Sequence, residues 1–322
     1  MMINKILILP LFFISLFIPI SAPSWILMWM GMEMNMLMFI FLILTKKNMF
    51  SSESSMKYFL IQCSGSLIFL LTLSSNFIYF NEWPFINSLV PPMALMLKSG
   101  FAPFHSWTPE IIKNFNFLSL LFFFTSLKIP PFFMIFSSWF NIMLWISIIN
   151  ILIGSIMGIV QSSFIKMLIA SSINNMGWMI LSLMYSNSLF LIQFIIYFIL
   201  MYNLIKIMKL NKIKWITQIN LNLFIVKTNF YINLLSLAGL PPFMGFTPKW
   251  IIIKKMMINT PIIIMIFIFM TTFNLFFYIK SCINTMFLFN LTKKWMTFYK
   301  NTIISLFLML NFNGITLFIL LT

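Results

Sequence analysis

Long runs of apolar residues, separated by short polar segments, follow one another along the whole chain. A membrane-spanning helix needs about 20 consecutive apolar residues. By this measure the sequence predicts eleven spans, at about 3–21, 25–44, 57–80, 85–108, 116–138, 141–160, 165–185, 188–208, 229–258, 260–285 and 302–321. We therefore expect an all-α, polytopic membrane helix bundle in which residues 1–322 form a single transmembrane domain.

Composition and charge support this interpretation. Of the 322 residues 61% are hydrophobic and 7% are charged, whereas soluble domains carry about 25% charged residues. The net charge of +16 could indicate nucleic acid, but the lysines lie in short connections between spans, so we expect no nucleic-acid partner. Fifteen of these lysines fall on the side of the N-terminus and two, Lys254 and Lys255, on the other. The positive-inside rule then places the N-terminus on the cytoplasmic or matrix side and the C-terminus opposite.

Residue usage also points to the origin of the gene. The chain contains 41 Phe and 29 Met but no arginine, a bias typical of A/T-rich codons and of a code that reads AUA as Met. This bias indicates an organellar genome.

A short motif occurs twice. The segment GFAPFHSWTPE at 100–110 aligns without gaps on GLPPFMGFTPK at 239–249. The copies lie in the fourth and the ninth predicted spans, five spans apart, and because five is odd the copies cross the membrane in opposite directions. This pattern is typical of an inverted-topology repeat with broken helices at matching positions. We expect repeat one at about 1–138, repeat two at about 141–285 and a C-terminal helix at about 302–321; the alternative is chance convergence of two Gly/Pro-rich kinks.

Proline doublets mark the expected helix breaks. Pro91-Pro92, Pro130-Pro131 and Pro241-Pro242 lie inside apolar spans. Proline removes a backbone donor and clashes with the preceding turn, and in a membrane the freed backbone groups need new partners or water. The sequence therefore predicts three interrupted spans.

Four ionisable residues lie well inside predicted spans: Glu33, Lys98, Lys128 and Lys249. A charge at the bilayer centre costs about 2.5–3.5 kcal/mol, so such residues by default indicate ion or proton handling. Each of the three lysines is next to an expected helix break. The alternative is snorkelling to the headgroups, which fits Lys98 and Lys128 poorly because each is about ten residues, or ~15 Å, from either end of its span.

Glu33 is the expected partner of one of these lysines, and Lys98 is the candidate. A pair at about 4 Å and an effective dielectric near 20 is worth about 4 kcal/mol, so moving the carboxylate away would favour release of the lysine's proton. The alternative is a protonated Glu33 that is hydrogen-bonded within the bundle. His105, the only histidine, is a further relay candidate because histidine changes charge near neutral pH, although a lone histidine often only satisfies a hydrogen bond.

Motifs for cofactor binding are absent from the sequence. There is no dinucleotide-binding glycine motif, no Walker loop and no Cys/His cluster, and the two cysteines, Cys63 and Cys282, lie far apart in predicted spans. We expect this chain to hold no cofactor and no metal.

Several motifs, taken in order, resemble the NADH dehydrogenase subunit 2 family of animal mitochondria, the antiporter-like membrane subunits of respiratory complex I. They are WMGMEMN, SSESSMKYFL, LMLKSGFAPFHSWTPE, SLKIPP, GSIMGIVQSSFIKMLIASSINNMGW and LSLAGLPPFMGFTPKW. The resemblance implies proton translocation across the mitochondrial inner membrane, driven by NADH oxidation and ubiquinone reduction in other subunits. It also implies neighbouring membrane subunits, accessory subunits and lipids such as cardiolipin as partners, with NADH, FMN, iron–sulfur clusters and ubiquinone bound elsewhere.

The resemblance further assigns roles to individual residues. It implies that Glu33 pairs with Lys98, that Lys128 is the central relay and that Lys249 gates the second half-channel; His105 also matches the family pattern. Asn175 departs from the pattern, because the family commonly has a histidine there and asparagine does not titrate. Two other functions stay open: a stand-alone or Mrp-type cation/proton antiporter, and a scaffold that only anchors neighbouring subunits.

Overall fold

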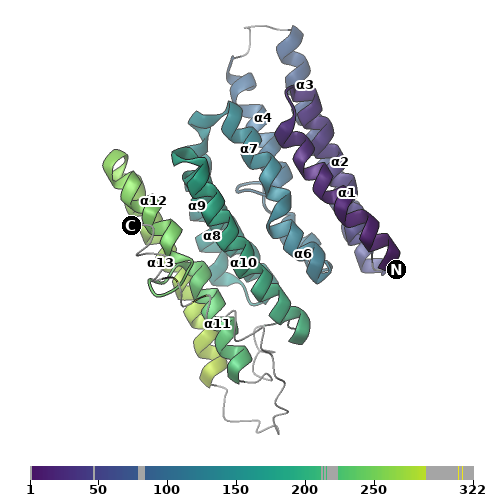
Figure 1. The fold of residues 1–322 in the computed structure, drawn as a ribbon. Helices are drawn as coiled ribbons and strands as arrows, with labels where there is room; N and C mark the ends of the chain where they lie inside the picture. The colour runs from purple at the N-terminus through teal and green to yellow at the C-terminus, as the bar shows by residue number, and fades with distance from the viewer. Residues whose placement is uncertain are drawn as a thin grey trace. The chain divides into compact units, whose positions relative to one another are not determined.

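The computed structural model describes residues 2–45, 48–78, 84–211, 213, 215, 224–287, 311 and 314. Within these residues the chain is helical and contains no β-strand, which confirms the predicted all-α fold (Figure 1). Seven of the described segments are long and apolar enough to cross a membrane. The count of eleven spans stays a prediction, and the last of them, 302–321, lies outside the described residues except at Asn311 and Gly314.

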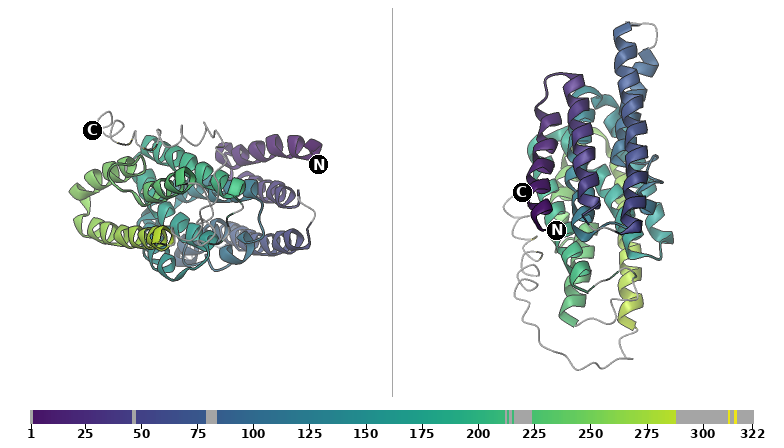
Figure 2. Two further views of the ribbon diagram at one scale, coloured as in Figure 1. Left: turned by 90° about the horizontal axis from the view of Figure 1, so that it is seen from below. Right: turned by 90° about the vertical axis from the view of Figure 1, so that its right-hand side faces the viewer.

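Contacts divide the chain into two compact units, Met1–Met143 and Leu144–Thr322. In the first unit, α1 and α2 lie side by side, α3 packs along α4, and α7 contacts both α1 and α4 (Figure 2). A cluster of aromatic rings fills the space between these helices, with Phe39 of α2 in contact with Phe12, Tyr58 and Phe123. The helices of this unit are α1 (Met2–Ser21), α2 (Trp25–Ile43), α3 (Met49–Ile78), α4 (Pro84–Ser99), α5 (Thr108–Ile112), α6 (Phe117–Phe124), the 3-10 turn η1 (Ser126–Lys128) and α7 (Ile129–Ser138).

The second unit is built around α9, which is buried along almost its whole length. Helix α9 contacts α10, α11 and α12. Its approach to α8 is close, because a Cβ added at Gly154 would lie 2.7 Å from the backbone nitrogen of Asn174; small residues allow such packing between membrane helices. The helices are α8 (Phe140–Val160, which begins in the first unit), α9 (Phe164–Tyr185), α10 (Asn187–Asn211), α11 (Phe224–Ala238), α12 (Phe246–Asn259) and α13 (Pro261–Phe287).

Two proline doublets occur at helix breaks, as predicted. Pro241-Pro242 lie between α11 and α12. Pro130-Pro131 occupy the first turn of α7, where a missing N–H leaves no hydrogen bond unmade, directly after the 3-10 turn that interrupts the predicted span 116–138. These breaks put Lys128 and Lys249 at helix starts rather than in helix interiors.

The prediction that Pro91-Pro92 breaks its helix is wrong. Both prolines lie inside α4, which continues to Ser99. Membrane helices tolerate proline where neighbouring helices and local adjustments satisfy the freed backbone groups, and α4 packs along α3. The break begins instead at Gly100, whose φ of 70° lies in the left-handed region that glycine adopts without strain.

Helix α3 begins at Met49, eight residues before the predicted start at 57. The SSESS segment, read from sequence as a connection, forms the first two turns. The Ser51 hydroxyl donates to the Asn48 carbonyl (2.6 Å) and accepts from its N–H (3.2 Å). Glu53 and Lys57 form an exposed i,i+4 ion pair of 2.7 Å, which supports a helix.

Candidate functional site

Glu33 of α2 and Lys98 of α4 form an ion pair, as the sequence predicted. The Nζ–Oε1 distance is 2.9 Å, and the side chains are 5% (Lys98) and 21% (Glu33) exposed. Lys98 lies in the last turn of α4, where the carboxyl end of a helix also favours a cation. The carboxylate and the helix end together stabilise the charged form of Lys98 inside the unit.

The helix break beside Lys98 is held by a side chain from α3. Gln62 donates from Nε2 to the backbone carbonyl of Lys98 at 2.8 Å, and the N–H of Phe101 returns to the carbonyl of Met96 at 3.0 Å. Gln62 is itself buried. Gln62 thus satisfies a carbonyl at the end of α4 that lacks a partner within the helix.

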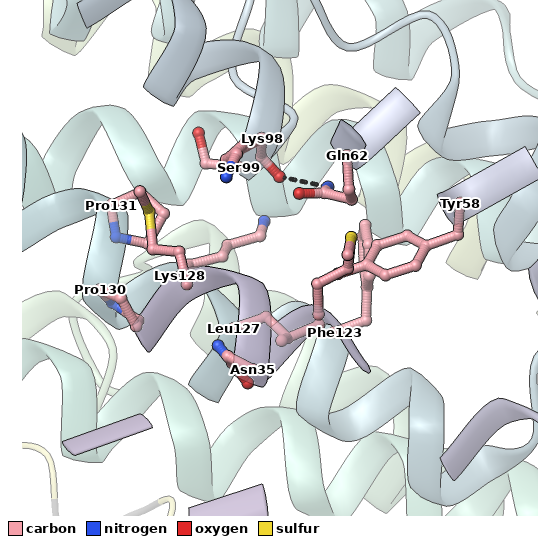
Figure 3. A pocket seen from close by; sticks show the side chains of 12 residues that line it. Asn35, Tyr58, Gln62, Lys98, Ser99, Phe123, Leu127, Lys128, Pro130 and Pro131 are labelled. Atoms are coloured by element: carbon pink, nitrogen blue, oxygen red, sulfur yellow. Dashed lines mark hydrogen bonds between the residues drawn. The ribbon is translucent and has the colours of Figure 1, made fainter. Parts of the chain in front are cut away.

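Lys98 and Lys128 line one cavity of about 30 Å³, together with Asn35, Gln62 and Ser99 (Figure 3). A water molecule needs about 10–15 Å³ by the same measure, so there is room for about two. In Figure 3 the Lys128 side chain reaches into the middle of this group. The Oδ1 atom of Asn35 is buried and has no hydrogen-bond partner among the described residues. The cavity is therefore both large enough and polar enough to hold water between the two amines.

Lys128 is 4% exposed at the end of the 3-10 turn before α7. Its Nζ lies 5.9 Å from the centre of the Phe124 ring, within the range of a cation–π contact. Burial of this amine contradicts the snorkelling alternative. The structure thus brings Glu33, Lys98 and Lys128 together in the first unit.

Lys249 lies in the first turn of α12 in the second unit, 6% exposed. Its amine donates to the carbonyls of Leu237 and Ala238, each at 2.9 Å, and lies 5.9 Å from the centre of the Trp178 ring. Those carbonyls end α11 and form the negative pole of its dipole. In the alignment of the two motif copies, Leu237 matches Lys98, so both units place an amine near the carboxyl end of the helix before the break.

A second cavity, of about 20 Å³, lies against Lys249. Its lining includes Asn175 of α9, Gln193 and Tyr197 of α10, and Ser236 of α11. The volume allows about one water molecule by the criterion used above. Asn175, where the resemblance leads us to expect a histidine, thus shares a cavity with Lys249.

His105 lies in the break between α4 and α5, partly buried and outside the residues that line the cavity of Lys98 and Lys128. Its backbone carbonyl accepts from the N–H (3.0 Å) and the hydroxyl (2.8 Å) of Thr108 at the start of α5. The backbone of His105 therefore anchors α5, and the proposed relay role of its side chain stays a prediction.

Sequence reasoning missed the uncharged polar residues that complete both cavities. Asn35, Gln62, Gln193 and Tyr197 are all buried in apolar helices. The signal that could have found them is spacing: Gln193 and Tyr197 are four residues apart and share a face of α10. Because these side chains are neutral, they give a weaker signal in the sequence than an intramembrane lysine does.

Three hydrogen-bonded asparagines connect α11 to the break between α11 and α12. The Nδ2 of Asn311 donates to Oδ1 of Asn233 at 2.7 Å, and Asn233 donates to Oδ1 of Asn229 at 2.9 Å. The N–H of Met244, in the break, donates to the backbone carbonyl of Asn311 at 3.2 Å. Asn311 thus provides partners both to α11 and to the backbone of the break.

We expect Asn311→Ala to loosen this break. Losing the partner of the buried Asn233 oxygen costs about 1–3 kcal/mol, and the backbone carbonyl at position 311, which accepts from Met244, is then held less firmly. Hydrogen–deuterium exchange of the 239–245 backbone should therefore accelerate about tenfold in the assembled protein. Asn187→Ala, at an exposed asparagine of the same unit, is the control. Unchanged exchange at 239–245 in Asn311→Ala would show that the amide chain does not hold the break.

Comparison with known proteins gives a consistent picture. The membrane family described as NADH:quinone oxidoreductase/Mrp antiporter, TM, matches residues 22–274. A protein of Anopheles gambiae called NADH-ubiquinone oxidoreductase chain 2 is 36% identical over 97% of this chain and 95% of its own length. A Hylobates lar protein of the same name is 34% identical over 85% of this chain and 83% of its own.

Two solved structures share the fold. A chain in respiratory complex I from Thermus thermophilus with bound aureothin superposes with a TM-score of 0.78 at 17% identity, covering 98% of this chain and 77% of that chain. A chain in the Mrp complex from Dietzia sp. has a TM-score of 0.72 at 15% identity, covering 85% and 59% respectively. At such identities the likeness concerns the fold alone.

Proposed function

Because the chain belongs to the family of NADH-ubiquinone oxidoreductase chain 2, we propose that it works as a proton-translocating membrane subunit of respiratory complex I. It is a multi-pass membrane protein and one part of a multi-subunit assembly. NADH oxidation and ubiquinone reduction take place in other subunits, and this chain converts part of the released free energy into proton movement.

The observation that carries this proposal is the Glu33–Lys98 ion pair, whose lysine lines the same cavity as Lys128. While Glu33 is near, the ammonium of Lys98 is stabilised. When Glu33 moves away, the charge of Lys98 stays buried without its counter-ion, which is strongly unfavourable. Lys98 then gives one proton to water in the cavity, and a proton passes on to Lys128 in its neutral form.

Lys249 has the corresponding role in the second unit. Its ammonium is held by two carbonyls and a ring, groups that favour a charge without neutralising it. We assign to Lys249 the gating of the second half of the path, and to His105 an accessory relay at the first break.

We further propose that the redox chemistry takes place in other subunits. We assign NADH, FMN, the iron–sulfur clusters and ubiquinone to partner subunits. The proposed contacts are neighbouring antiporter-like and small hydrophobic subunits, accessory subunits and cardiolipin. We place the chain in the mitochondrial inner membrane, with the N-terminus in the matrix and the C-terminus in the intermembrane space.

The test is proton pumping by the purified complex in sealed liposomes. With NADH and ubiquinone supplied, we expect proton translocation at the same rate whether the salt is sodium or choline chloride, because all the proposed carriers bind protons. Collapse of the pH gradient by an uncoupler is the control. Sodium–proton exchange without NADH, in liposomes that contain this chain, would instead establish the cation/proton antiporter.

A further inference from the structure

Two polar atoms on α10 lack a partner at the cavity beside Lys249. The Oε1 atom of Gln193 and the hydroxyl of Tyr197 are buried, with no hydrogen-bond partner among the described residues. Gln193 and Tyr197 are each 4% exposed, and both line the same cavity as Lys249. Leaving a buried polar group without a partner is unfavourable, so two such groups on one small cavity indicate a bound molecule that satisfies both.

The donors and acceptors around this cavity match a single water. A lysine ammonium has three N–H donors, and Lys249 uses two of them on the carbonyls of Leu237 and Ala238. The third N–H and the Tyr197 hydroxyl are donors, and Gln193 Oε1 is an acceptor. Buried waters typically make about three hydrogen bonds, and the cavity of about 20 Å³ admits one such molecule.

We propose that Gln193 and Tyr197 form a specific water-binding site against the amine of Lys249, and that both act as positioning residues for proton movement at that amine. The water accepts from Lys249 and from Tyr197 and donates to Gln193. When Lys249 gives up a proton, the water is the first group that accepts it, which leaves the amine neutral and the positive charge on the water. Every atom of this site comes from the second unit.

The site also explains how proton movement at Lys249 tolerates asparagine at position 175. Asn175 lines the same cavity but does not titrate. A fixed water next to the amine can accept and release a proton where a histidine ring would otherwise do so. This inference rests on the proposed function, because it concerns the path of the same protons.

The test is Tyr197→Phe in the assembled complex, with Tyr202→Phe as the control. Tyr202 is on the same helix but 41% exposed, so both variants lose one hydroxyl and only one of them loses it at the cavity. We expect Tyr197→Phe to slow NADH-driven proton translocation about threefold to tenfold, the effect of one lost hydrogen bond to the transferring group, and Tyr202→Phe to leave it unchanged.

Two further readouts separate positioning from packing. Gln193→Met keeps the length of the side chain but removes the acceptor, so it should slow translocation similarly. A high-resolution electron cryo-microscopy map should show one water between residues 193, 197 and 249 in the parent complex and none in Tyr197→Phe.

The outcomes also distinguish this inference from the proposed function. If Lys249→Met slows pumping but Tyr197→Phe and Gln193→Met do not, and the map shows no water there, the water site is refuted and the pump stands. If Lys249→Met also pumps at the parent rate, the role proposed for the second unit fails as well.

Discussion

Lys128→Met in the assembled complex is expected to slow NADH-driven proton translocation about tenfold or more. Methionine has a similar length and fills an apolar site, so the helix break before α7 should persist. It cannot bind a proton, however, and in the proposed mechanism Lys128 receives a proton from Lys98, with which it shares a cavity. The measurement is the initial rate of proton uptake in liposomes, together with the amount of assembled complex.

The matched control is Lys113→Met, which removes an exposed lysine at the end of α5 in the same unit. It should leave both pumping and assembly unchanged. If Lys128→Met assembles and pumps at the parent rate per NADH, the chain is a scaffold and the proton-pump function is refuted for the first unit.

Glu33→Gln should have an effect of similar size, because it removes the ion-pair partner of Lys98. Breaking a buried ion pair costs about 3–5 kcal/mol because it leaves an uncompensated charge; Glu33 keeps a fifth of its side chain exposed, so the cost here lies at the lower end. Lys98 then loses its proton permanently or holds it without control by Glu33. In either state coupled turnover falls on the order of tenfold.

The double variant tests whether Glu33 and Lys98 act as a pair. Because both single changes disable the same switch, Glu33→Gln combined with Lys98→Met should be no slower than the slower single variant, as expected for coupled residues. Glu53→Gln is the control, since it breaks the exposed pair with Lys57, where solvent screens the charges. Additive effects on the rate from Glu33 and Lys98 would contradict the switch.

The sequence predicted most of the helices and the pairing of Glu33 with Lys98, because apolar length and intramembrane charge are strong signals in a bilayer. It predicted less well where local chemistry competes with packing. Proline chemistry alone suggested a break at Pro91-Pro92, yet α4 continues through both; the break depends on Gly100 and on Gln62, which lies 36 positions from its partner. Such a partner is invisible in a sequence window.

The water site beside Lys249 was harder still to foresee. Gln193, Tyr197 and Asn175 are neutral, and only the packing of α9, α10 and α12 brings them to one cavity. Similarly, nothing in the sequence sets Asn311 apart within its predicted span, and only the structure shows its hydrogen bonds with Asn233 and Met244. Hydrogen bonds between polar groups that are far apart in the sequence form only in the folded chain, and they leave no periodic pattern in the sequence.

The two units differ in their acidic side chains. All four glutamates, Glu33, Glu53, Glu82 and Glu110, precede Met143, and the chain from Leu144 onward has no acidic side chain. Lys249 therefore has no carboxylate within its own unit, and the carbonyls that hold it carry only partial charge. An anionic side chain that acts on Lys249 must therefore come from outside residues 144–322, whereas Lys98 has its carboxylate partner, Glu33, within its own unit.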